Sequence, residues 1–151
     1  MHAQTDPAQA APFEQPVRPS FTLPVRVYYE DTDAGGVVYY ANYLKFCERA
    51  RTDWLRSCGI GQHRLASEDG VLFVVRSVRA DYRQPAVLDD DLAVVSTLAK
   101  LGHASLTFHQ KVLRDGVELF DAEVVIACID RHARRAIPIP PAVRAQFATL
   151  V

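Results

Sequence analysis

The longest periodic segment of the chain predicts an amphipathic helix over residues 41–57. Apolar residues recur there at helical spacing and form one face, made of Tyr43, Phe46, Cys47, Ala50 and Trp54. Gly59 follows the segment and is suited to end the helix as a C-cap. At ~1.5 Å per residue such a helix is about 25 Å long. A helix of this length with one apolar face needs a sheet to pack against.

Shorter apolar or alternating runs in the rest of the chain predict strands. They cover residues 21–29, 71–82, 92–98, 104–112 and 117–129. Asp115 and Gly116 separate the last two runs and indicate a hairpin, because a type I′ turn needs positive φ angles. A break with three prolines precedes a predicted short helix over residues 142–150.

The order of these elements indicates the α+β class. A strand is followed by the long helix and then by at least four strands in meander-like succession. This order predicts one long central helix wrapped by a curved antiparallel sheet. A single sheet of this kind leaves one face and at least one edge partly open, and pairing with a second copy would cover them. We therefore expect a homodimer at minimum.

Composition indicates one ordinary globular domain. The 151 residues are 49% hydrophobic and 23% charged, which predicts a single domain over residues 21–151. Residues 1–20 hold four prolines and many small or polar residues, so a disordered N-terminal tail is predicted there. This segment lacks the pattern of a signal peptide, which by default indicates a cytoplasmic protein.

The charge, the apolar runs and the motifs of the sequence indicate none of several common partners and cofactors. A net charge of −1 gives no electrostatic footprint for nucleic acid, and no apolar run approaches the ~20 residues that span a membrane. The three cysteines form no C-x-x-C pair, and the five histidines are scattered. No glycine-rich nucleotide motif occurs. We therefore expect no nucleic acid, membrane insertion, metal or cofactor.

The candidate chemistry lies in the segment that leads into the long helix. Asp33 is followed by Gly35 and Gly36, which allow close approach of a ligand to the backbone. A helix N-terminus offers free N–H groups and a partial positive charge. A carboxylate beside such donors can attack a carbonyl or activate water, while the donors hold the oxyanion. The simpler alternative is a solvated turn, since Asp favours turns.

Two other polar segments could bind ions or phosphate groups. An EF-hand loop starting at Asp31 fails, because its fifth position is Gly35 and its twelfth is Asn42 rather than Glu. The basic run of residues 131–135, RHARR, with Arg144 nearby, is either a solvated loop or a dock for phosphate groups.

The run VRVYYEDTDAGGVVYYANYLKFCERAR, residues 25–51, resembles the signature of hotdog-fold acyl-CoA thioesterases. It is most similar to the YbgC type, associated with the Tol–Pal gene cluster and related to 4-hydroxybenzoyl-CoA thioesterase. The similarity spans about residues 21–140. It implies the hotdog fold, a long central helix wrapped by an antiparallel sheet, in dimers that often pair into homotetramers.

The resemblance also implies roles for individual residues. Asp33 matches the catalytic carboxylate, and the backbone N–H of Tyr40, at the start of the helix, matches the amide that polarises the thioester carbonyl. Many YbgC-type members have His at the position of Tyr40, so the role is assigned to the backbone donor. The implied substrate-binding residues are Gly35, Gly36, Val37, Asn42, Glu48, Lys100 and His103, the last two for the CoA phosphates.

The implied activity is hydrolysis of short-to-medium or aromatic acyl-CoA to free acid and CoA. Asp33 would act either as nucleophile, through a mixed anhydride, or as general base for water. An acyl carrier protein is an alternative carrier. The competing function is a non-hydrolytic acyl-CoA or acyl-carrier-protein binding module on the same fold. A dehydratase or hydratase is less favoured, because related enzymes use a His and residues 25–59 contain none.

Overall fold

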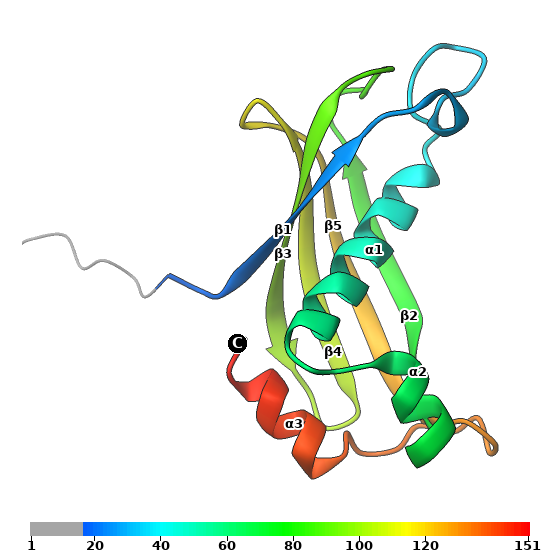
Figure 1. Ribbon diagram of the computed structural model, residues 1–151, viewed down its shortest axis with the longest axis vertical. Coiled ribbons are helices and arrows are strands. Elements are labelled where there is room, and N and C mark those ends of the chain that lie inside the picture. Colours follow the sequence, from blue (N-terminus) through cyan, green and yellow to red (C-terminus); the bar gives the residue numbers. More distant parts are fainter. Residues whose placement is uncertain (1–16) are drawn as a thin grey trace, which may run out of the picture.

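The computed structural model describes residues 17–151, in which five strands curve around one long helix (Figure 1). The strands are β1 (Ser20–Arg26), β2 (Val71–Tyr82), β3 (Asp91–Leu101), β4 (Ser105–Arg114) and β5 (Val117–Asp130). The helices are α1 (Asn42–Ser57), the short α2 (Gln62–Arg64) and α3 (Pro141–Ala148). A 3-10 turn, η1 (Tyr29–Asp31), and a π turn, η2 (Leu65–Asp69), complete the elements. The predicted α+β hotdog arrangement is confirmed.

The sheet is antiparallel with the strand order β1-β3-β4-β5-β2. Only β3, β4 and β5 form the predicted meander. β2 pairs with β5, so the chain crosses the sheet between β2 and β3, and the simple succession of four strands was wrong. The alternation of apolar residues determines which face of a strand is buried but not which strand lies beside it. Register shifts in the β2–β5, β3–β4 and β4–β5 pairings add bulges that help to curve the sheet.

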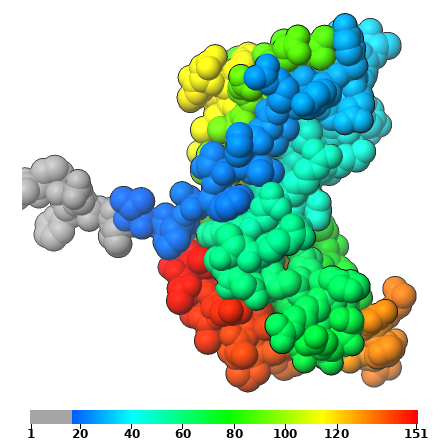
Figure 2. Space-filling model, in the orientation of Figure 1, coloured from blue at the N-terminus to red at the C-terminus, as the bar shows by residue number. Residues whose placement is uncertain are grey.

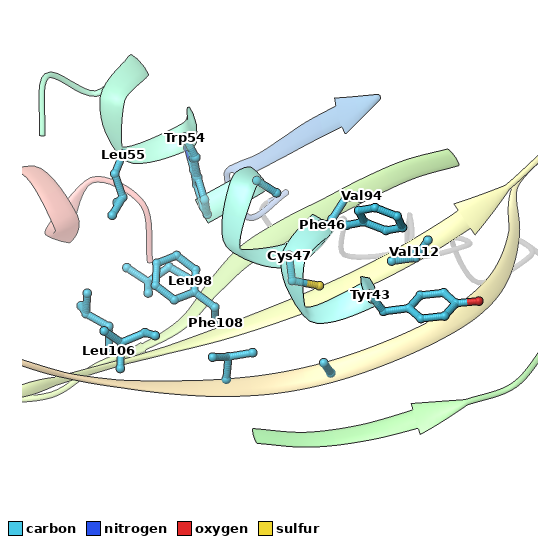
Figure 3. Close-up of a cluster of buried hydrophobic side chains, with 14 of the residues drawn as sticks. Tyr43, Phe46, Cys47, Trp54, Leu55, Val94, Leu98, Leu106, Phe108 and Val112 are labelled. Carbon is cyan, nitrogen blue, oxygen red and sulfur yellow. The ribbon is translucent and has the colours of Figure 1, made fainter. Parts of the chain in front are cut away.

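The core lies between α1 and the concave face of the sheet. Figure 3 shows side chains of α1 packed toward β3 and β4. The five apolar residues predicted for the helix face are all buried, as are alternate residues of β4 and β5. Burying each large apolar side chain stabilises the fold by about 1.5–3 kcal/mol. This packing fixes the position of the helix and of the loop that precedes it.

The first strand ends earlier than predicted, at Arg26 instead of residue 29. The carboxylate of Asp31 accepts a hydrogen bond from the Tyr28 N–H at 2.8 Å, which turns the chain into the 3-10 turn η1. Tyr28 and Tyr29 favour a strand by composition, but this local bond ends it. Of the predicted N-terminal tail, residues 1–16 lie outside the described residues, and Ser20 belongs to β1.

Cys47 and Cys128 are buried and Cys58 is half-buried, all as free thiols. Burial raises the pKa of the Cys47 thiol to about 12, so it is not a nucleophile at neutral pH. Within residues 17–151, no cluster of three or more metal-ligating side chains occurs. None of the helices described there has both the length and the apolar character that a membrane crossing requires.

Candidate active site

The segment between β1 and α1 folds into a tight loop at one end of the molecule, above α1 in Figure 1. The Asp33 N–H donates to the Val37 carbonyl at 2.9 Å, and the Tyr39 N–H donates to the Asp31 carbonyl at 2.8 Å. These bonds join Thr32 and Val38 in a β-bridge. The loop is therefore a small hairpin, which holds its residues in fixed positions.

Asp33 stands at the tip of this hairpin with an exposed side chain. Its Oδ1 accepts a hydrogen bond from the Gly35 N–H at 2.8 Å, and its carbonyl accepts one from the Gly36 N–H at 3.0 Å. Among the described residues, Oδ2 of Asp33 has no hydrogen-bond donor. One carboxylate oxygen is thus oriented by the loop, and the other is open to react.

Tyr40 lies two residues before the helix, because α1 begins at Asn42. Tyr40 thus lies just before the N-cap residue Ala41: the Asn42 N–H donates to the Tyr39 carbonyl at 2.8 Å, so residues 39–42 form a turn that leads into α1. In the described part of the chain, the Tyr40 N–H has no acceptor. The Tyr40 carbonyl accepts the Tyr82 hydroxyl proton at 2.8 Å. The residue is therefore held in place while its N–H stays available.

One cavity brings the two candidate catalytic residues together. Asp33, Val37 and Tyr40 line a space of about 320 Å³, and its remaining walls are Val38, Tyr43, Tyr82, Arg83, Gln84 and Pro85. Burial raises the pKa values of Tyr43 and Tyr82, so both phenols stay protonated at neutral pH. Asp33 is the carboxylate among the residues that line this cavity, and Tyr40 lines the same cavity.

The two glycines and Asn42 shape the loop. Gly36 has a φ of +78°, a conformation that favours glycine. A Cβ on Gly35 would lie 3.1 Å from Oδ1 of Asp33. The Asn42 side chain is buried and donates to the Asp31 carbonyl at 2.8 Å, since side chains in a first helical turn point back over the N-terminus. Asn42 thus ties the loop to α1 and does not line the cavity.

Glu48 lies about two helical turns beyond Tyr40, on a groove between α1 and β2. The groove is about 290 Å³ and is lined by Leu44, Lys45, Glu48, Arg51, Val75, Val78 and Val124. It adjoins a deeper cavity of about 120 Å³. In the space-filling view the molecule is hollowed on the β2 side, between the Asp33 loop and the end that carries α2 (Figure 2). Glu48 is exposed there and accepts a hydrogen bond from the Thr52 hydroxyl at 2.9 Å.

Lys100 and His103 lie at the other end of the sheet from Asp33. β1 pairs with β3 so that Arg26, just before the Asp33 loop, faces Asp91. Lys100 follows nine residues later, about 30 Å along the strand at ~3.3 Å per residue. His103 is exposed in the turn between β3 and β4. Within one chain the structure does not bring these two residues to the catalytic loop.

The basic run of residues 131–135 lies at this same far end. The Arg131 N–H donates to the Gly70 carbonyl at 2.8 Å, which places the run beside the start of β2. All five side chains are exposed. Asp130 accepts the N–H groups of His132 and Ala133 at 2.9 and 2.6 Å, and these bonds lower the pKa of Asp130.

Arg51 is not one of the apolar residues predicted for the helix face, but it is buried, with 8% exposure. Its Nη1 donates to Oε1 of Gln110 at 2.7 Å. The sequence feature that could have indicated this buried contact is Gln110, a polar residue between Phe108 and Val112 on the buried face of β4. A polar side chain in such a position needs a buried partner.

Comparison with known proteins identifies the family of this chain. The model of the thioesterase-like superfamily matches residues 27–147. The acyl-CoA thioesterase YbgC of Haemophilus influenzae is 44% identical over 127 residues, which cover 84% of this chain and 93% of the relative. The acyl-CoA thioester hydrolase YbgC of Escherichia coli is 43% identical over 128 residues, covering 84% and 95%.

A solved structure gives the same result for the fold. A probable thioesterase from Bartonella henselae has 34% sequence identity and a TM-score of 0.77, and the match covers 81% of this chain and 100% of that one. The family match extends over most of the chain, and two relatives exceed two fifths identity. This chain therefore belongs to the thioesterase-like superfamily.

Proposed function

We propose that the protein is an acyl-CoA thioesterase that releases free acid and CoA. The observation that carries this proposal is the cavity that Asp33 and Tyr40 both line. Two relatives at 43–44% identity bear the names acyl-CoA thioesterase and acyl-CoA thioester hydrolase. A carboxylate and a free backbone donor in one cavity suit attack on a carbonyl.

The mechanism follows from these two groups. The thioester oxygen accepts a hydrogen bond from the Tyr40 N–H, which stabilises the charge that develops there in the transition state. Asp33 then either removes a proton from water as the water oxygen attacks the carbonyl carbon, or attacks this carbon itself. In both routes the carbon–sulfur bond breaks and the CoA thiolate takes a proton. A mixed anhydride formed by direct attack would be hydrolysed by water in a second step.

The groove along α1 supports a short-to-medium or aromatic acyl group. It runs past Leu44, Val78 and Glu48, and Leu44 directly follows Tyr43, which lines the Asp33 cavity. Its walls are mainly apolar, so burial of a hydrocarbon chain or ring supplies binding energy of ~25 cal/mol per Å². Lys45 and Glu48 are exposed polar residues that such a group passes.

A second copy of the chain would complete the site. β2 is a 12-residue edge strand with exposed apolar side chains, among them Val75 at 52% and Val78 at 42% exposure. Antiparallel pairing of two β2 strands about a two-fold axis would cover them. It would also bring the far end of the partner, with Lys100, His103 and residues 131–135, toward the Asp33 end of the first chain. We assign the CoA phosphates to those basic residues, supplied in trans, in a dimer or a tetramer of two dimers.

Thiol release from a panel of short, medium, long and aromatic acyl-CoAs tests the proposal. The Asp33→Asn variant keeps the side-chain shape and removes the charge. We expect its kcat to fall by about 100-fold or more, as for loss of a general base or nucleophile. Asp115→Asn, in the β4–β5 hairpin and outside the lining of the cavity, is the matched control and should keep full activity.

The other outcomes of this experiment are informative. A fully active Asp33→Asn protein would refute the assigned mechanism. If the wild type binds acyl-CoA tightly but releases no thiol, the same assay with acylated carrier protein decides between a different carrier and a non-hydrolytic binding module.

A further inference from the structure

A buried cation without a carboxylate partner lies beside the acyl groove. The Arg51 side chain is 8% exposed, and no Asp or Glu of residues 17–151 forms an ion pair with it. A buried charge is costly to keep unless it is paired. Burial accordingly lowers the pKa of Arg51, although a guanidinium remains charged at neutral pH.

The neighbours of Arg51 hold its head group in one place. Gln110 is fully buried, and its Nε2 donates to the Cys47 carbonyl at 2.9 Å and to the Ser96 hydroxyl at 2.8 Å. This orientation of the amide turns Oε1 toward Arg51, which donates to it at 2.7 Å. One Arg51 nitrogen is thus fixed by neutral partners. A guanidinium carries five N–H donors, so most of its donor capacity is not used by this bond.

The remaining surface of Arg51 faces a largely apolar space. Arg51 lines both the 290 Å³ groove and the adjoining 120 Å³ cavity. The apolar walls of the cavity are Leu55, Phe73, Val75, Leu106, Phe108 and Ile126. Its other polar residues satisfy one another: Gln62 donates to the Thr52 hydroxyl oxygen at 3.2 Å, and Thr52 donates to Glu48 at 2.9 Å. Arg51 is therefore the cationic donor in this cavity that could bind a ligand.

The distance from the catalytic loop matches the length of an acyl group. Residues 40 and 51 are separated by about 16 Å along the helix axis at ~1.5 Å per residue. Side chains tilt toward the N-terminus of a helix, so the Arg51 head group lies closer to Tyr40 than its Cα does. If the Tyr40 N–H binds the thioester carbonyl, the far end of a medium-length acyl group would reach the Arg51 guanidinium.

We propose that Arg51 determines acyl specificity by binding an oxygen atom at the far end of the acyl group, either a carboxylate or a hydroxyl oxygen. The inference rests on the proposed function, because it places the thioester at the Asp33 loop. A distal carboxylate would form the ion pair that Arg51 does not make with any residue of 17–151. A distal hydroxyl would accept from Arg51 and donate to Glu48. Methyl-tipped acyl groups of the same length leave the buried donors without an acceptor.

Three chain-matched thioesters test this proposal: octanoyl-CoA, ω-hydroxyoctanoyl-CoA and octanedioyl-CoA. We expect wild-type kcat/KM to be at least ~10-fold higher for one or both oxygen-tipped thioesters, because a site built to hydrogen-bond a substrate discriminates strongly. Arg51→Met should abolish this preference, so that its kcat/KM values for the three thioesters become similar to one another. Arg51→Lys keeps the charge and should preserve preference for the carboxylate tip. Arg56→Met, exposed in the last turn of α1, is the control and should behave like wild type.

Binding measurements separate this proposal from the proposed function. Calorimetric Kd values for the three thioesters, taken on Asp33→Asn with and without Arg51→Met, report tip recognition even without hydrolysis. Equal Kd and kcat/KM values for the three tips in the wild type would overturn the proposal and leave thioesterase activity untouched. A parallel loss on all three thioesters in folded Arg51 variants would also overturn it and assign Arg51 to structure alone. If Arg51→Met fails to fold, the kcat/KM values of the wild type and of Arg51→Lys for the three thioesters still test whether Arg51 recognises the tip.

Discussion

At the scale of single residues, the two glycines after Asp33 meet different requirements. Gly36 has a φ of +78°, and a Cβ there would meet nothing within 4 Å. Gly35 has no such backbone requirement, but a Cβ there would lie 3.1 Å from the Asp33 carboxylate. One glycine therefore serves the backbone conformation, and the other leaves room for the reactive group.

Alanine at each glycine should separate stability from turnover. Gly36→Ala should lower the free energy of unfolding by about 1–2 kcal/mol, because a left-handed conformation strains any residue with a Cβ. Gly35→Ala should leave stability nearly unchanged and lower kcat by roughly tenfold, since Asp33 must shift from its position. Urea unfolding and steady-state thiol release measure the two effects. Equal losses of activity in both variants would show that Gly35 has no special role beside the carboxylate.

Some features of the candidate site could be predicted from the sequence, and others could not. Asp33 and the two glycines are adjacent in the chain, so their pattern alone indicated a reactive loop. Arg51 and Gln110 are far apart in sequence, and their contact exists only because α1 lies on β4. Asn42 matched a family motif, but its contact with the Asp31 carbonyl is a matter of loop geometry. Local patterns were therefore predictable, whereas the partners of buried polar groups were not.

At the scale of elements, Asp90 joins the ends of three strands. Its carboxylate accepts the Val87 N–H at 2.9 Å and Nη1 of Arg114, at the end of β4, at 2.7 Å. Its carbonyl accepts the Val27 N–H, just after β1, at 3.0 Å. Burial alone would raise the pKa of Asp90, but the Val87 N–H and the Arg114 guanidinium outweigh it and lower the pKa. Asp90 thus holds together the end of the sheet that supports the Asp33 loop.

Acid should remove the stabilisation that Asp90 provides. Because the folded pKa lies below the ordinary Asp value of ~3.9, the stabilisation is complete above about pH 4. It is lost as the pH falls through the folded pKa. Asp90→Asn should cost about 1–3 kcal/mol of unfolding free energy at pH 7, and its difference from wild type should narrow below pH 4. Chemical denaturation across this pH range measures the difference.

Asp91→Asn is the control for this prediction. The Asp91 carboxylate pairs with Arg26 at 2.7 Å, but its side chain is 76% exposed. An exposed ion pair of this kind contributes about 0–1 kcal/mol, so the variant should remain close to wild type. A gap between Asp90→Asn and wild type that stays constant down to pH 2 would contradict the assigned role of the Asp90 charge.

The elements themselves were largely predictable, but their order in the sheet was not. The 3.6-residue and two-residue periods identified α1 and the strands, because burial of one face imposes these periods. The pairing of β2 with β5 joins residues up to about sixty positions apart, such as Val71 and Asp130. Such pairing depends on how the sheet closes around the helix, and no short-range pattern encodes it. Asp31 likewise ended β1 through one local hydrogen bond that strand propensity does not describe.

At the scale of the whole molecule, the two edges of the sheet differ. β1 is a seven-residue edge strand that contains Pro24, and it ends in Arg26, which pairs with Asp91. Proline and charged residues protect an edge from pairing. β2 is longer, and its exposed residues include Val74, Val75 and Val78. The β2 edge is therefore the one that a second copy would cover, and it borders the acyl groove.

A charge placed on this edge should separate the proposed dimer. Val75 is 52% exposed in the single chain, so Val75→Lys should fold normally. In the dimer its charge would be buried, and we expect the dissociation constant to rise at least ~10-fold, which corresponds to about 1.4 kcal/mol. Val117→Lys is a matched control, because Val117 is 45% exposed but lies at the start of β5, away from the β2 edge. Sedimentation equilibrium of both variants measures the oligomeric state.

The same pair of variants connects assembly to catalysis. If Lys100, His103 and residues 131–135 reach the CoA phosphates only from the partner, a monomeric Val75→Lys protein should have a raised KM for CoA thioesters. Val75 also lines the groove, so the decisive comparison uses concentration: raising the protein concentration until the variant reassociates should restore its KM. A KM that stays high in the reassociated dimer would trace the defect to the acyl groove. A wild-type KM in the monomer would show that one chain holds the whole of its substrate.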